Sequence, residues 1–160
     1  MKVTFIGTHN FAAEILQGIA KESFFDIVQV VTQPDKPVGR KKELTPPPVK
    51  VLAEQLDIAI EQPKTLKKFV LPQEVELVIV AQYGKIIPKT LLEAPKYGVI
   101  NVHTSLLPKY RGASPIQSAL INGEQTTGVT IMKMDEGLDT GPILLQKELN
   151  IHPTETAPEL

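Results

Sequence analysis

Three polar residues in the second half of the chain lie at the ends of predicted apolar strands or in the turn that follows one, where open α/β sheets place their chemistry. Asn101 and His103 stand two residues apart at the end of an apolar run, and Asp139 lies between two glycines in the segment Asp135 to Gly141. Alternate residues of a strand project to the same side, so Asn101 and His103 would share one crevice if both are extended. An amide donates hydrogen bonds, and an imidazole and a carboxylate can exchange protons. These three residues form the candidate site.

Each of these residues also has an ordinary structural use. Asparagine near a strand end often forms a turn, and a lone histidine is usually a satisfied structural residue. The glycines on either side of Asp139 allow a backbone path that aims a carboxylate inward. For Asp135, beside Glu136, we expect only a surface turn. Asp139 is therefore the preferred carboxylate.

The elements that must position these residues alternate between strands and helices. Apolar, β-branched runs predict strands at 3–6, 26–32, 58–60, 77–81, 99–102, 128–134 and 142–151. Apolar periodicity and first-turn prolines predict helices at 11–19, 48–56, 64–70, 88–93 and 115–120. We predict an α/β fold that is Rossmann-like and doubly wound, with a mostly parallel sheet and helices on both faces.

The composition restricts the class of protein. A chain of 160 residues with 42% apolar content can form one core, and its net charge of -1 gives no whole-chain attraction to nucleic acid or membrane. Cysteine is absent, and no spaced His, Asp and Glu cluster resembles a zinc site, so we expect no metal. No apolar run approaches membrane-spanning length, and the N-terminus leads directly into a strand. We expect one domain of a cytoplasmic protein without membrane contact.

The segment from Gln33 to Pro48 differs from the rest of the chain, with five prolines and four cations. Proline supports neither a β-ladder nor a helix interior, so we expect an exposed loop. The cations could bind phosphates with an affinity that falls with salt, and the alternative is a solvated charged loop. They are Lys36, Arg40, Lys41 and Lys42.

Two turns after predicted strands bear on cofactor binding. The turn GTHNFA lacks the G-x-G-x-x-G spacing, which disfavours a dinucleotide cofactor. Gln82 and Tyr83 form a polar and aromatic turn after the strand 77–81. Tyr83 is either a rim or core aromatic or a platform for a ligand.

These motifs resemble the methionyl-tRNA formyltransferase family. The resemblance rests on NVHTSLLPKYRGASPIQSAL, TGVTIMKMDEGLDTGPIL and TQPDKPVGRKKELTPPPVK, and it covers nearly the whole chain. The first two motifs are similar also to those of formyltransferases that act on glycinamide ribonucleotide and on amino sugars. The basic loop resembles the tRNA enzymes in particular.

The resemblance implies a formyltransferase fold and transfer of a formyl group from 10-formyltetrahydrofolate to the α-amine of methionyl-initiator-tRNA, in translation initiation. It implies that Asn101 orients the formyl oxygen, that His103 donates a hydrogen bond and protonates the leaving nitrogen, and that Asp139 favours the charged imidazole and accepts the amine's proton. The implied folate contacts are Ser105, Leu106, Leu107 and Pro108, with Gln82 and Tyr83 nearby. The implied tRNA contacts are Arg40, Lys41, Lys42 and Lys36.

By the same resemblance, residues 1–160 are a catalytic domain truncated at its C-terminal side, and the family's C-terminal β-barrel domain is absent. We expect the full-length protein to be monomeric. Two alternatives stay open. One is a formyltransferase acting on an amino-sugar nucleotide or glycinamide ribonucleotide, and the other is a folate-binding fragment without activity.

Overall fold

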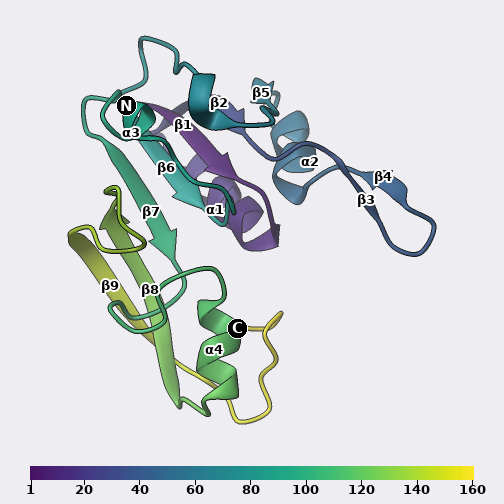
Figure 1. The fold of residues 1–160 in the computed structure, drawn as a ribbon, viewed down its shortest axis with the longest axis vertical. Helices are drawn as coiled ribbons and strands as arrows, with labels where there is room; N and C mark the ends of the chain where they lie inside the picture. The colour runs from purple at the N-terminus through teal and green to yellow at the C-terminus, as the bar shows by residue number, and fades with distance from the viewer. The chain divides into compact units, whose positions relative to one another are not determined.

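The chain folds as two units, Met1–Val99 and Ile100–Leu160, in a computed structural model that describes all residues 1–160. Strand β7 (Val99–His103) contains the boundary between them. Figure 1 follows the chain from the first strand to the C-terminus. No helix has the length and apolar character needed to cross a membrane.

The first unit contains a parallel sheet. Its strands are hydrogen-bonded in the order β5-β2-β1-β6, and each neighbouring pair is parallel, with Phe5 opposite both Val30 and Ile79. The strands are β1 (Lys2–Gly7), β2 (Asp26–Val31), β5 (Ile60–Glu61) and β6 (Leu77–Ala81). The helical segments are α1 (Asn10–Ala20), α2 (Pro48–Gln55), the 3-10 turn η1 (Leu66–Lys68) and α3 (Lys89–Leu92).

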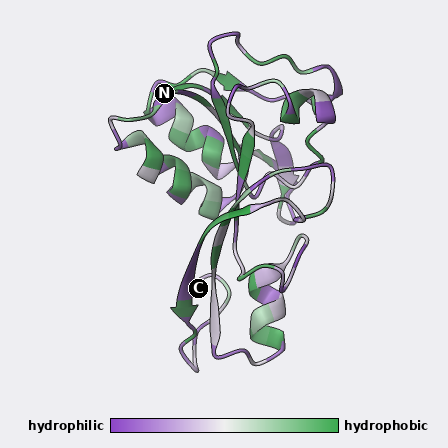
Figure 2. Ribbon diagram, turned by 90° about the vertical axis from the view of Figure 1, so that its left-hand side faces the viewer, coloured by the Kyte–Doolittle hydropathy of each residue, from purple (hydrophilic) through white to green (hydrophobic).

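Burial explains why these segments form these elements. All five residues of β6 are buried, as expected for a central strand covered on both faces. Helix α1 buries Ala12 and Leu16 and exposes its polar residues, and the helical ribbons in Figure 2 accordingly show both hydrophobic and hydrophilic colours. A Cβ at Gly7 would lie 2.7 Å from Ala12 Cβ and 2.9 Å from the Ala81 carbonyl oxygen. Gly7 therefore permits the close packing of β1, α1 and β6.

The second unit is antiparallel. Strand β8 (Thr126–Lys133) lies between β7 and β9 (Ile143–Asn150), and α4 (Pro115–Ile121) precedes it in sequence. His103 lies opposite Thr130, which lies opposite Gln146. Cross-strand partners share a face, so these three side chains lie on one face of the unit.

The proline-rich segment is exposed over residues 36–45, as predicted, but the prediction of a loop without strands is wrong. Instead of an irregular loop, β3 (Lys36–Val38) and β4 (Glu43–Thr45) form an antiparallel hairpin that projects beside α2 (Figure 1). Pro37 lies opposite Leu44. A two-stranded ribbon has only edge strands, so the missing proline N–H does not interrupt a central ladder.

The remaining predictions differ mainly in length. The predicted helix 64–70 is only the three-residue turn η1, and the strand expected at 58–60 is Ile60–Glu61. Strand ends are shifted by one or two residues elsewhere, as at β8 and β9.

Candidate active site

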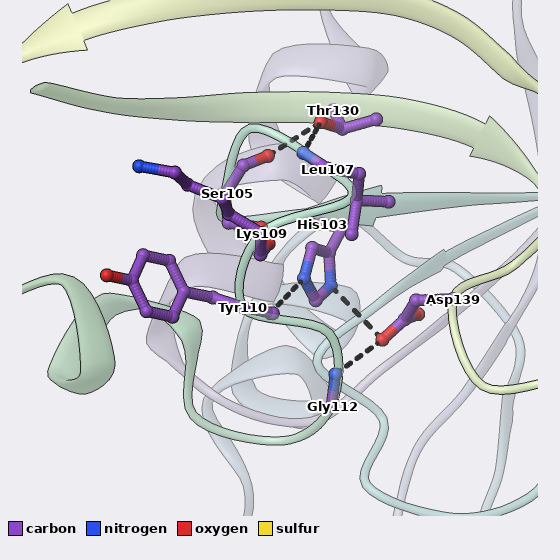
Figure 3. A network of polar contacts seen from close by, with 8 residues as sticks. All are labelled: His103, Ser105, Leu107, Lys109, Tyr110, Gly112, Thr130 and Asp139. Atoms are coloured by element: carbon purple, nitrogen blue, oxygen red, sulfur yellow. Dashed lines mark hydrogen bonds and ion pairs between the residues drawn. The ribbon is translucent and has the colours of Figure 1, made fainter.

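His103 lies between two oxygen acceptors at the end of β7. Its Nδ1 is 3.7 Å from Asp139 Oδ2, and its Nε2 is 2.9 Å from the Tyr110 carbonyl oxygen (Figure 3). The side chains of His103 and Asp139 are only 6% and 11% exposed. The structure therefore brings together two of the three residues chosen from sequence.

These contacts decide which ring nitrogen can exchange a proton. A carbonyl oxygen only accepts, so Nε2 must carry the hydrogen that it donates to Tyr110. Nδ1 is then the nitrogen that gains or loses a proton, and it faces the Asp139 carboxylate. The imidazolium is the form that presents a hydrogen to both acceptors.

A tight turn presents the Asp139 carboxylate. Asp139 has a φ of 51°, in the left-handed region that aspartate tolerates, and its Oδ2 accepts a hydrogen bond from the Gly112 N–H at 2.8 Å. Asp135 is exposed, and its Oδ1 accepts from the Gly137 N–H at 2.9 Å and from the Thr140 hydroxyl at 2.8 Å. Asp135 thus stabilises the surface turn expected for it, and Asp139 reaches toward His103.

Asn101 lies two residues before His103 in β7, opposite Met132 of β8. Strand alternation places Asn101 and His103 on one face. Asn101 is half-buried, and no hydrogen bond engages its amide. The amide group is therefore available to a ligand.

The segment Ser105 to Pro108 is held by its neighbours through backbone groups. The Thr130 hydroxyl donates to the Ser105 carbonyl oxygen at 2.6 Å and accepts from the Leu107 N–H at 3.2 Å (Figure 3). Gln146 Nε2 donates to the Leu107 carbonyl oxygen at 2.9 Å. The sequence analysis did not identify Thr130 and Gln146. Their only signal in the sequence is that each is a polar residue within a predicted strand. They fix the loop in advance of any ligand.

Gln82 and Tyr83 belong to the first unit. The Tyr83 side chain is 1% exposed, so its ring belongs to the core, and burial raises the pKa of its hydroxyl. The Tyr83 carbonyl oxygen accepts from Gln33 Nε2 at 2.6 Å and from the Thr8 hydroxyl at 3.2 Å. Gln82 is half-buried, with a φ of 42°. Of the two interpretations left open for Tyr83, this burial favours a core aromatic.

The four cations of the proline-rich segment divide into two positions. Arg40, Lys41 and Lys42 are exposed in the turn between β3 and β4. Lys36 lies at the base of the hairpin, where its Nζ donates to Gln33 Oε1 at 2.6 Å. Three cations are therefore gathered at the tip, and the fourth belongs to the structural contacts at the base.

Asp35 anchors the same base. Its carboxylate lies 2.8 Å from Lys50 Nζ and accepts from Gln62 Nε2 at 2.7 Å. These hydrogen bonds, of which the one from Gln62 has the largest effect, hold the pKa of Asp35 below its usual value.

The chain contains no group of three or more His, Asp and Glu residues arranged to hold a metal ion.

Comparison with known proteins gives a family. A family model described as "Formyl transferase" matches residues 1–160. The chain belongs to the formyl transferase family. The α/β formyltransferase fold predicted from the sequence is confirmed by this match and by similar solved structures.

Several relatives and structures resemble the chain closely. It is 55% identical to a methionyl-tRNA formyltransferase of Caldicellulosiruptor saccharolyticus, over 94% of this chain and 50% of that protein. It is 50% identical to that of Thermotoga maritima, over 100% of this chain and 52% of that protein. The chain spans about half the length of the curated relatives it matches.

Among solved structures, a phosphoribosylglycinamide formyltransferase from Bacillus halodurans has a TM-score of 0.74 and 25% identity, over 99% of this chain and 84% of that chain. A sugar 3N-formyl transferase, WlaRD, solved in the presence of dTDP and 5-N-formyl-THF, has a TM-score of 0.67 and 27% identity, over 99% of this chain and 55% of that chain.

Proposed function

We propose that the full-length protein transfers a formyl group from 10-formyltetrahydrofolate to the α-amine of methionyl-initiator-tRNA, in translation initiation. The observation that carries this proposal is the 50–55% identity, over nearly all of the chain, to relatives named methionyl-tRNA formyltransferase. The pairing of His103 with Asp139 supports it, because the reaction needs groups that move protons.

Formyl transfer to an amine proceeds in two steps and needs few catalytic groups. The methionyl amine attacks the formyl carbon, and a tetrahedral intermediate with an oxyanion forms. The bond from that carbon to the folate nitrogen then breaks. An α-amine titrates near neutral pH, so a substantial fraction is already nucleophilic. The protein must orient the reactants, stabilise the oxyanion and return a proton to the leaving nitrogen.

The residues of the second unit fit these tasks. Asn101 supplies an uncharged amide donor to orient the formyl oxygen, and its lack of a protein partner suits that role. Asp139 accepts the proton that the amine loses, directly or through a water. His103, protonated at Nδ1, is the acid that returns a proton to the folate nitrogen.

The Nε2 contact limits what His103 can do. Nε2 already donates to the Tyr110 carbonyl oxygen, so proton exchange with a reactant would pass through Nδ1 and Asp139. Asn101 is left as the principal donor to the formyl oxygen.

Binding of the two substrates is assigned to separate segments. Folate would lie along Ser105, Leu106, Leu107 and Pro108, whose backbone is fixed by Thr130. The tRNA would be held by the hairpin tip, through its exposed cations Arg40, Lys41 and Lys42. Lys36 contributes less directly, because Gln33 already engages it.

An acceptor comparison tests this proposal. The full-length protein is supplied with 10-formyltetrahydrofolate and, separately, with methionyl-initiator-tRNA, glycinamide ribonucleotide and an amino-sugar nucleotide. We expect the tRNA to be formylated far faster than the small amines. Preferential formylation of either small amine would contradict the assignment of the acceptor and leave the formyltransferase family unaffected.

A further inference from the structure

Tyr110 contacts two different parts of the second unit. Its hydroxyl donates to Glu124 Oε1 at 2.6 Å, and its carbonyl oxygen accepts from His103 Nε2 at 2.9 Å. Glu124 lies after α4, far from the reacting groups in sequence. The proposed reaction uses neither the Tyr110 side chain nor Glu124, although Tyr110 joins this carboxylate to the imidazole.

The backbone at Tyr110 needs such an anchor. Tyr110 has a φ of 55°, in the left-handed region that is costly for a bulky aromatic residue. Figure 3 shows its ring pointing away from His103 while its carbonyl faces the imidazole. The segment is also held on each side, since the Ser105 hydroxyl donates to the Lys109 carbonyl oxygen at 2.6 Å and Gly112 N–H donates to Asp139. The phenol–carboxylate contact, the strongest influence on the Tyr110 hydroxyl, fixes the Tyr110 side chain itself.

The hydrogen bond from Tyr110 to Glu124 is stronger than the neighbouring ion pair between Lys109 and Glu124. A hydrogen bond of 2.6 Å from a hydroxyl to a carboxylate is short and charge-assisted. It lowers the pKa of Glu124 and raises the pKa of Tyr110, so the pair stays carboxylate and phenol at neutral pH. Lys109 Nζ also lies 3.1 Å from Glu124, but its side chain is 66% exposed, and such surface ion pairs contribute little.

We propose that Tyr110 and Glu124 are positioning residues that hold the Tyr110 carbonyl oxygen on His103 Nε2. This contact fixes the neutral tautomer in which Nε2 carries the hydrogen and Nδ1, facing Asp139, carries none. If that carbonyl moved away, a neutral imidazole could instead place its hydrogen on Nδ1, toward the carboxylate, and leave Nε2 bare. The nitrogen that exchanges protons would then be the wrong one. The catalytic consequence rests on the proposed formyl transfer, and the tautomer itself does not.

Nitrogen-15 NMR of the His103 ring tests the tautomer directly. The full-length protein is compared with Tyr110→Phe, Glu124→Gln and the control Lys109→Ala, at a pH where the ring is neutral. His103→Ala assigns the signal. We expect Nε2 to carry the hydrogen in the parent protein and in Lys109→Ala, and both tautomers to be populated in Tyr110→Phe. Glu124→Gln should lie between them, because its amide oxygen still accepts from the phenol but without the charge.

The kinetics of the same variants give the second readout. Tyr110→Phe should lower kcat by about 10-fold, the scale of one lost charge-assisted hydrogen bond, with KM for the folate unchanged. Lys109→Ala should keep the parent kcat. A Tyr110→Phe protein with the parent ring spectrum would overturn the inference, whatever its kcat.

The two proposals fail separately. A parent protein that does not formylate methionyl-tRNA, but whose His103 spectrum changes in Tyr110→Phe, would refute the proposed function and support the positioning role. A parent protein that formylates the tRNA, with an unchanged spectrum in Tyr110→Phe, would refute only the positioning role. Glu124→Gln provides the same comparison if Tyr110→Phe does not fold.

Discussion

Asp139 combines a charge and a backbone anchor, and two substitutions separate them. Asp139→Asn removes the charge but keeps an oxygen that can accept from the Gly112 N–H, and asparagine tolerates the left-handed φ of 51°. Asp139→Ala removes the acceptor as well and places an ordinary side chain at a positive φ. The two substitutions should therefore lower activity alike but lower stability to different extents.

The magnitudes follow from these contacts. Both variants lack the carboxylate that faces His103, so both should lose at least about 10²-fold in kcat, the scale of lost acid-base assistance. Asp139→Asn should lower the free energy of unfolding by about 1 kcal/mol, because the hydrogen bond to Gly112 becomes neutral. Asp139→Ala should lower it by about 2.5–5 kcal/mol, from the lost charge-assisted bond and the left-handed backbone.

The assay pairs steady-state formylation of methionyl-initiator-tRNA with chemical denaturation, on the full-length protein. We expect kcat to fall alike in the two variants while stability falls mainly in Asp139→Ala. Near-normal turnover of Asp139→Asn would refute the role of the charge. Equal stability of the two variants would refute the anchoring of this turn through Gly112.

Four further predictions follow from the same structure. His103→Ala should lower kcat by at least about 10²-fold in the formylation assay, and near-normal turnover would remove His103 from the mechanism. Gly7→Ala should lower the free energy of unfolding by about 1–3 kcal/mol or more in chemical denaturation, because its Cβ would meet three atoms within 2.9 Å. The control Gly18→Ala, whose Cβ would meet nothing within 4 Å, should raise it by about 0.5–1 kcal/mol. Arg40→Ala should weaken tRNA binding and reduce its log–log salt slope by about 0.9, and an unchanged slope would exclude a phosphate contact. Because the pKa of Asp35 is lowered in the folded protein, its carboxylate stabilises the fold at pH values above the usual carboxyl pKa, and this stabilisation is lost as the pH falls through the folded pKa. The free energy of unfolding of Asp35→Asn should therefore decrease less steeply than that of the parent protein below about pH 4.

The sequence predicted those parts of the fold that depend on local burial. The run Leu77–Ala81 is entirely apolar and is a fully buried strand, and α1 follows the periodicity of its apolar residues. The spacing of Asn101 and His103 correctly indicated one face of a strand, because both lie in β7. Period-two alternation needs no tertiary information once the strand is recognised.

Features that depend on tertiary contacts were not visible in the sequence. Composition alone could not show that Pro37 sits in a two-stranded ribbon, where a missing N–H is tolerated. The roles of Tyr110 and Thr130 depend on a backbone carbonyl and a cross-strand hydroxyl, and a side-chain motif records neither. The engagement of Lys36 by Gln33 likewise appears only when the hairpin base is folded.

The rate at which formyl-methionine forms on charged initiator tRNA tests the proposed formyl transfer itself. The full-length protein is supplied with 10-formyltetrahydrofolate, and the product is followed beside an Asp139→Asn control. We predict formylation of the methionyl amine by the parent protein and a rate at least about 10²-fold lower in the control. A parent protein that forms no formyl-methionyl-tRNA, while formylating another amine with the same folate, would contradict the proposed acceptor.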